Sequence, residues 1–133
     1  MHEFQLNKVV IMVGSNSKEN WELVDVLKRS DIWMHLKDAP SAHALIRIPK
    51  KLRENKYTVM NSLTYAARML CAQSSKNISS KNDNVVFIYT NGKYVNKGSK
   101  EGEVILSKKP DEITIENPYK WIVKKYDNHI SYF

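Results

Sequence analysis

The sequence has one cysteine, Cys71, and four glycines among its 133 residues. A single cysteine excludes an internal disulfide and a cysteine-rich zinc site, and Cys71 falls in a helical pattern as a small apolar residue would. The glycines are too scattered for a phosphate-cradling loop, because Gly14 lacks the companion glycines that such a loop requires. GxSxG, HExxH and dinucleotide-binding motifs are also absent. We therefore expect that the protein binds no cofactor and no metal, and that it is not an enzyme of the classes that these motifs define.

Long hydrophobic runs are lacking as well. The N-terminal segment MHEFQLNKVVIMVG contains acidic Glu3, has no cationic region and carries an apolar run of only a strand's length. It fits neither a secretory signal nor a membrane span, and we expect a cytoplasmic protein. The length suits one domain, and the sequence shows no internal repeat or low-complexity linker.

Basic residues are in excess and unevenly distributed. Lys and Arg number 21 against 14 Asp and Glu, which gives a formal net charge of +7. Residues 1–46 hold 5 basic and 6 acidic residues, whereas residues 47–133 hold 16 and 8. A localised positive charge attracts polyanions through counterion release. Nucleic acid is the first candidate ligand and an anionic membrane surface the second, although many basic proteins bind neither.

Hydrophobic periodicity and turn residues predict a single α+β domain over residues 1–117. We expect a mixed, mostly antiparallel sheet packed with two helices. The first helix is capped by Asn16 or Ser17 and the second by Thr58. The Asn91-Gly92 pair predicts a type I′ hairpin turn. The predicted strands span residues 4–13, 31–36, 43–48, 84–90, 93–96, 103–107 and 113–116, and the second helix spans 57–75. The aromatic and basic tail, residues 118–133, is expected to pack on the domain or on a partner.

The stretch DIWMHLKDAPSAHALIR, residues 31–47, is the most informative part of the chain. It predicts two alternating strands joined by a turn at Pro40. Trp33, His35 and Lys37 fall on the same side of the first strand, and His43 and Arg47 on one side of the second. With a suitable register these side chains form one cationic, aromatic surface. A strand Trp is nevertheless more often a core residue, and a strand His is usually a hydrogen-bonded structural residue.

This stretch closely resembles the NFACT-R domain, the RNA-binding domain of ribosome-associated quality-control factors. The resemblance rests on the pattern D-I-W-x-H-x-K-x-x-P-x-x-H-x-x-I-R/K, and the preceding run VGSNSKENWEL also resembles the family. It covers roughly residues 9–116. Residues 100–103 depart from the family, because Glu101 stands where proline is usual, which weakens that loop as a phosphate clamp. The resemblance implies a non-catalytic RNA-binding α+β domain, with tRNA or ribosomal RNA as ligand and the large ribosomal subunit as a further partner.

The expected RNA contacts combine the hairpin, the polar residues at the first helix and two basic loops. Asn16 and Asn20 could serve in helix capping and turn formation instead of contacting RNA. The basic run at residues 50–56 could be a solvated face that makes no phosphate contact. The candidate residues are Asn16, Lys18, Asn20, Trp33, His35, Lys37, His43, Arg47, Lys50, Lys51, Arg53, Lys97 and Lys100.

Three alternatives to RNA binding stay open at this point. The domain could dock on a ribosomal or other protein, with the basic excess serving solubility. It could bind DNA or an anionic membrane. Finally, Asp31, His35, Asp38 and His43 could form an acid-base or metal constellation for RNA processing, which requires groups within reach of one proton path.

Overall fold

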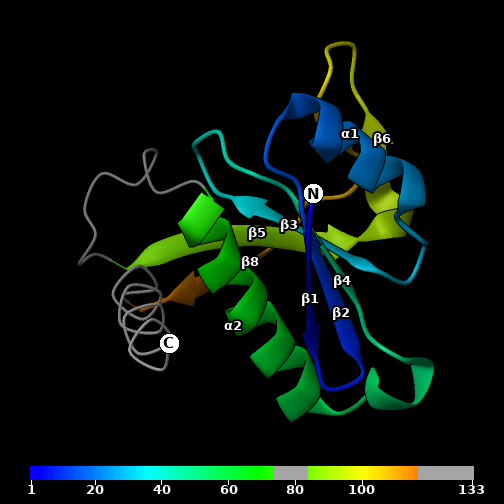
Figure 1. Ribbon diagram of the computed structural model, residues 1–133, viewed down its shortest axis with the longest axis vertical. Coiled ribbons are helices and arrows are strands. Elements are labelled where there is room, and N and C mark those ends of the chain that lie inside the picture. Colours follow the sequence, from blue (N-terminus) through cyan, green and yellow to red (C-terminus); the bar gives the residue numbers. More distant parts are fainter. Residues whose placement is uncertain (74–83, 117–133) are drawn as a thin grey trace, which may run out of the picture.

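The computed structural model describes residues 1–73 and 84–116 of the chain, so the predicted tail at 118–133 lies outside the described residues. These residues form a six-stranded sheet, a two-stranded sheet and two α-helices (Figure 1). This confirms the predicted α+β class, and every strand pairing in the described part is antiparallel. The elements are β1 (His2–Leu6), β2 (Val9–Val13), α1 (Ser17–Val26), β3 (Ile32–Leu36), β4 (Ala44–Arg47), η1 (Lys50–Leu52), α2 (Lys56–Gln73), β5 (Val85–Asn91), η3 (Gly92–Tyr94), β6 (Val95–Lys97), β7 (Val104–Leu106) and β8 (Asp111–Ile115).

The strand order of the large sheet is β1-β2-β4-β3-β5-β8, which places the predicted hairpin of β3 and β4 at its centre. The pairing of Trp33 with Leu45 and of Met34 with Ala44 fixes the hairpin register. The prediction of one continuous strand over residues 4–13 was wrong. The chain turns at Asn7, whose φ of 57° lies in the left-handed region, and β1 folds back on β2. Asparagine is among the residues that tolerate this conformation best, which a search for apolar runs does not register.

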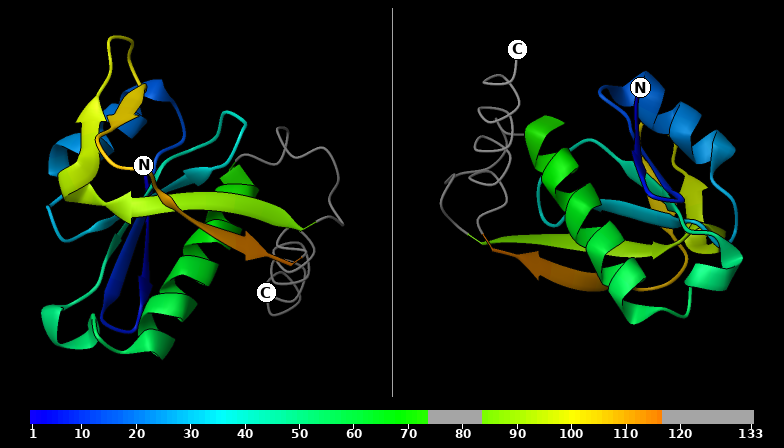
Figure 2. Two further views of the ribbon diagram at one scale, coloured as in Figure 1. Left: turned by 180° about the vertical axis from the view of Figure 1, so that it is seen from behind. Right: turned by 60° about the horizontal axis from the view of Figure 1, so that its bottom comes forward.

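The two helices cover opposite faces of this sheet (Figure 2). Side chains alternate between faces along each strand, so Met34 and Ala44 point to one face and Trp33 and Leu45 to the other. Met34 and Ala44 pack in the main core, to which α2 contributes Leu63, Ala66, Ala67 and Leu70. Trp33 and Leu45 pack instead with Leu23 of α1 and with half-buried residues of β6 and β7. The hairpin is therefore buried on both faces.

Helix capping explains where the two helices begin. Asn16 Oδ1 accepts a hydrogen bond from Glu19 N at 2.9 Å, which confirms Asn16 as the cap of α1. Asn55 Oδ1 accepts from Thr58 N at 3.1 Å, so α2 begins at Lys56 and the prediction of Thr58 as its cap was wrong. No helix within residues 1–73 and 84–116 is long and apolar enough to cross a membrane.

The predicted hairpin at Asn91-Gly92 is absent. Asn91 has a φ of −73°, and β5 continues into η3 instead of folding back on itself. β6 pairs with β7, so the predicted pairing of residues 93–96 with the preceding strand was wrong. Gly92 serves a different need, because a Cβ at this position would overlap the carbonyl oxygen of Lys28. Glycine here permits a close approach of two backbone segments rather than a positive φ.

Candidate nucleic-acid interface

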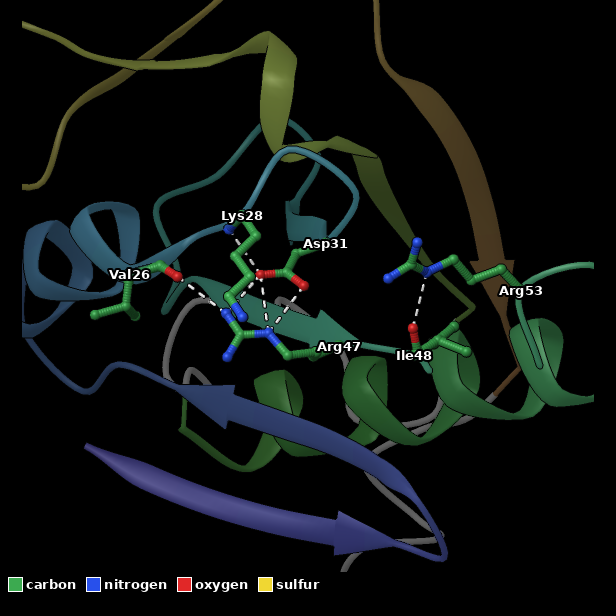
Figure 3. Close-up of polar contacts among 6 residues, drawn as sticks. All are labelled: Val26, Lys28, Asp31, Arg47, Ile48 and Arg53. Carbon is green, nitrogen blue, oxygen red and sulfur yellow. Dashed lines mark hydrogen bonds and ion pairs between the residues drawn. The ribbon is translucent and has the colours of Figure 1, made fainter. Parts of the chain in front are cut away.

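A partly buried ion pair joins Asp31, the residue before β3, to Arg47, the last residue of β4. The Asp31 side chain is 2% exposed and the Arg47 side chain 32%. Arg47 Nε donates to both carboxylate oxygens of Asp31, at 3.0 and 3.2 Å, and Arg47 Nη2 donates to Oδ2 at 2.7 Å (Figure 3). The hydrogen bond to Asp31 raises the pKa of Arg47 above its usual value. Paired bonds of this kind fix the geometry of both side chains.

The same pair anchors the segment that follows α1. Arg47 Nη2 donates to the carbonyl oxygen of Val26 at 2.9 Å, and Lys28 N donates to Asp31 Oδ2 at 2.7 Å (Figure 3). The Asp31 carbonyl in turn accepts from Gly92 N at 2.8 Å. Asp31 and Arg47 therefore hold together the end of α1, the central hairpin and the start of η3. Arg47 was expected to face RNA, whereas the structure shows it bonded within the domain.

Replacing Asp31 tests this anchoring. Asp31→Asn leaves the Arg47 guanidinium without its charged partner, and we expect the free energy of unfolding to fall by about 3 kcal/mol. Chemical denaturation of both proteins measures the difference. Asp38→Asn is the matched control, because Asp38 is exposed and its φ of 62° suits asparagine. Equal stability of the two variants would contradict the anchoring role.

Three rings form a cluster beside this pair, on the α1 side of the sheet. Trp33 Nε1 donates to His43 Nδ1 at 3.2 Å, so neutral His43 carries its hydrogen on Nε2. The His35 ring stacks on Trp33 with centroids 5.7 Å apart and meets His43 edge-on at 4.9 Å. His35 Nδ1 lies 2.6 Å from the Leu36 carbonyl oxygen, which can only accept. Nδ1 of His35 therefore carries the hydrogen, and its Nε2 is an acceptor.

Burial holds both histidines neutral. Desolvation, with a smaller contribution from nearby His35, lowers the pKa of His43 to about 3. Desolvation also lowers the pKa of His35, partly offset by its bond to the Leu36 carbonyl. Protonation of His43 at Nδ1 would also break its bond from Trp33. At neutral pH the cluster therefore offers hydrogen-bonding groups and an aromatic surface, and no positive charge.

The buried His43 makes stability depend on pH. Below its ordinary value of 6.5 the unfolded chain binds a proton at His43 that the folded protein does not bind until about pH 3. The free energy of unfolding therefore falls as pH is lowered through this window, by up to about 1.4 kcal/mol per pH unit for this one group. Urea unfolding between pH 7 and 5 measures the slope. In His43→Gln, whose amide can still accept from Trp33, the slope should be smaller.

His2→Gln is the matched control for this slope, because His2 is exposed on the edge strand β1. The slope of His43→Gln should be smaller than the slope of this control. A slope in His43→Gln that is as steep as in the control would show that His43 does not titrate as the structure implies.

The exposure predicted for this surface was partly wrong. Trp33 is 2% exposed, His43 5% and Asn20 8%. Trp33 and His43 lie on the predicted side of the hairpin, but α1, which carries Asn20, and the β6–β7 pair cover that side. Asn20 ties α1 to the hairpin, because its Oδ1 accepts a hydrogen bond from His43 N at 3.1 Å. Sequence alternation correctly predicts which residues share a side, and it does not reveal that a helix lies over them.

Five of the predicted cations form two separate groups. Lys18 is exposed in the first turn of α1, and the loop carrying exposed Lys100 approaches that turn, since a Cβ on Gly102 would lie 3.0 Å from Ser17 Cα. Lys50 and Lys51 are exposed in η1, near the turn between β1 and β2 (Figure 1). Exposed Arg53 follows them, and its Nε donates to the Ile48 carbonyl at 2.9 Å (Figure 3). The hairpin does not bring these groups together.

Two other predicted cations are engaged in ion pairs. Lys37 Nζ lies 3.0 Å from Glu112 of β8, and the hydrogen bond to Glu112 raises the pKa of Lys37. Lys97 Nζ lies 2.6 Å from Asp25 and 5.0 Å from the centre of the Trp21 ring. Both pairs are exposed, so a phosphate can compete for these cations.

A third basic group, which the sequence did not predict, lies around Tyr94. Lys93 Nζ and Lys108 Nζ lie 5.1 and 5.0 Å from the centre of its ring. Lys93 also lines a small cavity with Arg29, Ser30 and Asn91. These residues are far apart in the sequence, and the only local signal was Lys93 directly after Asn91-Gly92. Within the described residues, no group of three His, Cys, Asp or Glu side chains could hold a metal ion.

Comparison with known proteins places these features in a family. The sequence profile of the family described as NFACT protein RNA binding domain (NFACT-R) matches residues 2–108. The chain is 35% identical over 71 residues to the Rqc2 homolog RqcH of Bacillus subtilis (strain 168). That match covers 53% of this chain and 12% of the relative.

A solved structure shares the fold. It is the C-terminal part of the fibronectin/fibrinogen-binding protein from Streptococcus suis, with a TM-score of 0.68 and 26% identity. The match covers 89% of this chain and 44% of that one. The class defined by the fold and the profile is an RNA-binding α+β module rather than a catalytic domain. The chain belongs to the NFACT-R family.

Proposed function

We propose that this domain binds structured RNA, tRNA or ribosomal RNA, without chemical change, and that the α1 side of the sheet is the contact surface. The observation that carries the proposal is the match of residues 2–108 to an RNA-binding family. The net charge of +7 supports it, because phosphate contacts supply most of the affinity of proteins for nucleic acid. A cytoplasmic location is part of the same proposal.

The contact surface that we propose is formed by the start of α1, the half-buried His35 and the loop between β6 and β7. Lys18 and Lys100 would neutralise phosphates. The acceptor Nε2 of His35 would receive a hydrogen bond from a ribose hydroxyl or a base. Trp33, Asn20 and His43 would act indirectly, by holding His35 and α1 in place. Asn16 already caps α1 through Oδ1, and its side-chain NH₂ group can still donate.

Lys50, Lys51 and Arg53 would extend the contact over the far end of the domain. They are exposed, and no ion pair joins them to another described residue. Lys37, Arg47 and Lys97 would contribute less, since each is already paired with a carboxylate. A folded RNA is large enough to reach both ends of a domain of this size.

The relationship to RqcH, an Rqc2 homolog, supports a role linked to ribosome-associated quality control, with the large ribosomal subunit as the site of action. The chain spans 12% of that relative's length, so only the binding activity of this part is carried over. The steps that the longer relative performs with its other parts are outside this proposal.

A protein-binding role is the second candidate. The structural relative is part of a protein named for binding fibronectin and fibrinogen. Tyr57 and Met60, one turn apart on α2, are 83% and 52% exposed. This role predicts RNA binding that is weak and independent of RNA length, and a protein partner that stays bound after nuclease treatment.

Paired charge reversals test the RNA surface. Lys18→Glu/Lys100→Glu should lower the affinity for tRNA by about tenfold or more at moderate salt. It should also reduce the slope of log K against log salt by about 0.7 to 0.9 for each phosphate that the protein no longer neutralises. Fluorescence anisotropy over a salt series measures both quantities.

Lys56→Glu/Lys109→Glu is the matched control, because it makes the same change in net charge at two exposed lysines outside the proposed surface and outside the group around Tyr94. Its affinity for tRNA should fall less, because only the overall positive electrostatic potential of the protein is reduced. Equal losses of tRNA affinity in the two double variants would show that the α1 side is not the contact surface. If the unmodified protein does not bind tRNA at low ionic strength, the proposed function is wrong.

A further inference from the structure

The basic group around Tyr94 lies outside the surface proposed above. Its cations come from three separate segments: Arg29 follows α1, Lys93 belongs to η3, and Lys108 follows β7. We call these three residues the Tyr94 group. All three are exposed, and no ion pair joins them to another described residue. The group therefore gathers three positive charges that no carboxylate in the described part of the chain neutralises by an ion pair.

Backbone hydrogen bonds bring these cations together. Lys93 N donates to the Arg29 carbonyl oxygen at 3.2 Å, which holds η3 against the segment between α1 and β3. Ser107 N donates to the Tyr94 carbonyl oxygen at 2.9 Å, which extends the β6–β7 pairing and places Lys108 next to η3. The backbone that carries the cations is thus fixed before a ligand arrives, which lowers the entropic cost of binding.

The Tyr94 ring gathers two of the cations. Nζ of Lys93 and Nζ of Lys108 lie 5.1 and 5.0 Å from the ring centre, within the distance at which an aromatic ring attracts an ammonium group. Because both ammonium groups are close to one ring, they also repel each other. An anion bound by both would offset this repulsion.

A small cavity shares Lys93 with this arrangement and adds neutral hydrogen-bond donors. It has a volume of about 300 Å³ and is lined by Arg29, Ser30, Asn91 and Lys93. The Ser30 hydroxyl and the Asn91 amide can donate hydrogen bonds, as both cations can. No Asp or Glu is among the described lining residues. This combination suits phosphate oxygens, which accept strong hydrogen bonds from charged donors.

We propose that the Tyr94 group binds a phosphate of the RNA backbone, as a second contact apart from Lys18 and Lys100. This inference rests on the proposed function and extends the contact surface to the other end of α1. α1 has 10 residues and is therefore about 15 Å long. Lys18 lies in its first turn and Arg29 beyond its last residue, so the two groups would contact different phosphates of one RNA.

RNA is favoured over other anionic ligands by the position of the group. α1, β6 and β7 cover the same side of the sheet, and α1 and β6 lie next to each other (Figure 1). The Tyr94 group is carried by segments that directly adjoin these elements. An RNA on the proposed surface would therefore have a second basic group within its reach. An acidic peptide, or a role of the cations in offsetting the negative end of α1, is an outcome of the test.

Two single charge reversals test the proposal by fluorescence anisotropy with tRNA. Lys93→Glu and Lys108→Glu should each lower the affinity at least about threefold more than Lys56→Glu does. Lys56→Glu is the matched control, because it makes the same change in net charge at an exposed lysine at the start of α2. Equal losses of affinity in the three variants would overturn the second contact.

The salt dependence separates a phosphate contact from a structural role. The slope of log K against log salt should fall by about 0.7 to 0.9 in Lys93→Glu, because one phosphate is no longer neutralised. An unchanged slope together with a lower free energy of unfolding would show that Lys93 only stabilises the fold. Combined with Lys18→Glu/Lys100→Glu, the loss should be additive, since the two groups contact different phosphates.

Failure of this inference and failure of the proposed function give different results. If the unmodified protein binds tRNA and the variants of the Tyr94 group behave like Lys56→Glu, only the second contact is wrong. If the unmodified protein does not bind tRNA at low ionic strength, the proposed function is wrong and the second contact falls with it. Polyglutamate that displaces tRNA from the unmodified protein but not from Lys93→Glu would assign the group to an acidic peptide instead.

Discussion

The ion pair between Asp31 and Arg47 is the interaction on which the rest of the structure depends. It places a carboxylate that is almost fully buried against a guanidinium with paired hydrogen bonds. Through Val26, Lys28 and Gly92 it joins α1, the central hairpin and η3. A buried charge is tolerated only with such a partner, so the pair also specifies how these segments meet. Loss of the pair would remove the hydrogen bond that ties the end of α1 to the hairpin through the Val26 carbonyl.

Part of this arrangement could be predicted from the sequence. Alternation of side chains placed Asp31, Trp33, His35, His43 and Arg47 on one side of a β-hairpin, and the register confirms it. Sequence could not show that α1 and the β6–β7 pair bury this side, because burial depends on contacts between distant segments. The polar types at these positions suggested an exposed surface, whereas most of them satisfy one another inside the domain.

The turns were the least predictable part for a related reason. Asn91-Gly92 has the composition of a hairpin turn, yet Gly92 is needed where the backbone passes close to Lys28. Asn7, inside an apolar run, does adopt the left-handed conformation and splits the predicted strand. Local propensity gives the residue types that a turn accepts, and the tertiary contact decides which turn forms. The same limit applies to the site, since the β6–β7 loop that carries Lys100 approaches the first turn of α1, which carries Lys18, only through tertiary structure.

The central claim is that RNA binds on the α1 side of the sheet, over a surface held by the Asp31–Arg47 pair. The most direct measurement is amide chemical-shift mapping of the labelled protein with tRNA at two salt concentrations. The account predicts that the largest shifts fall at residues 16–18, at His35 and at residues 97–100, and that they shrink as salt increases. Shifts confined to residues outside these segments, or no shifts at low salt, would contradict it.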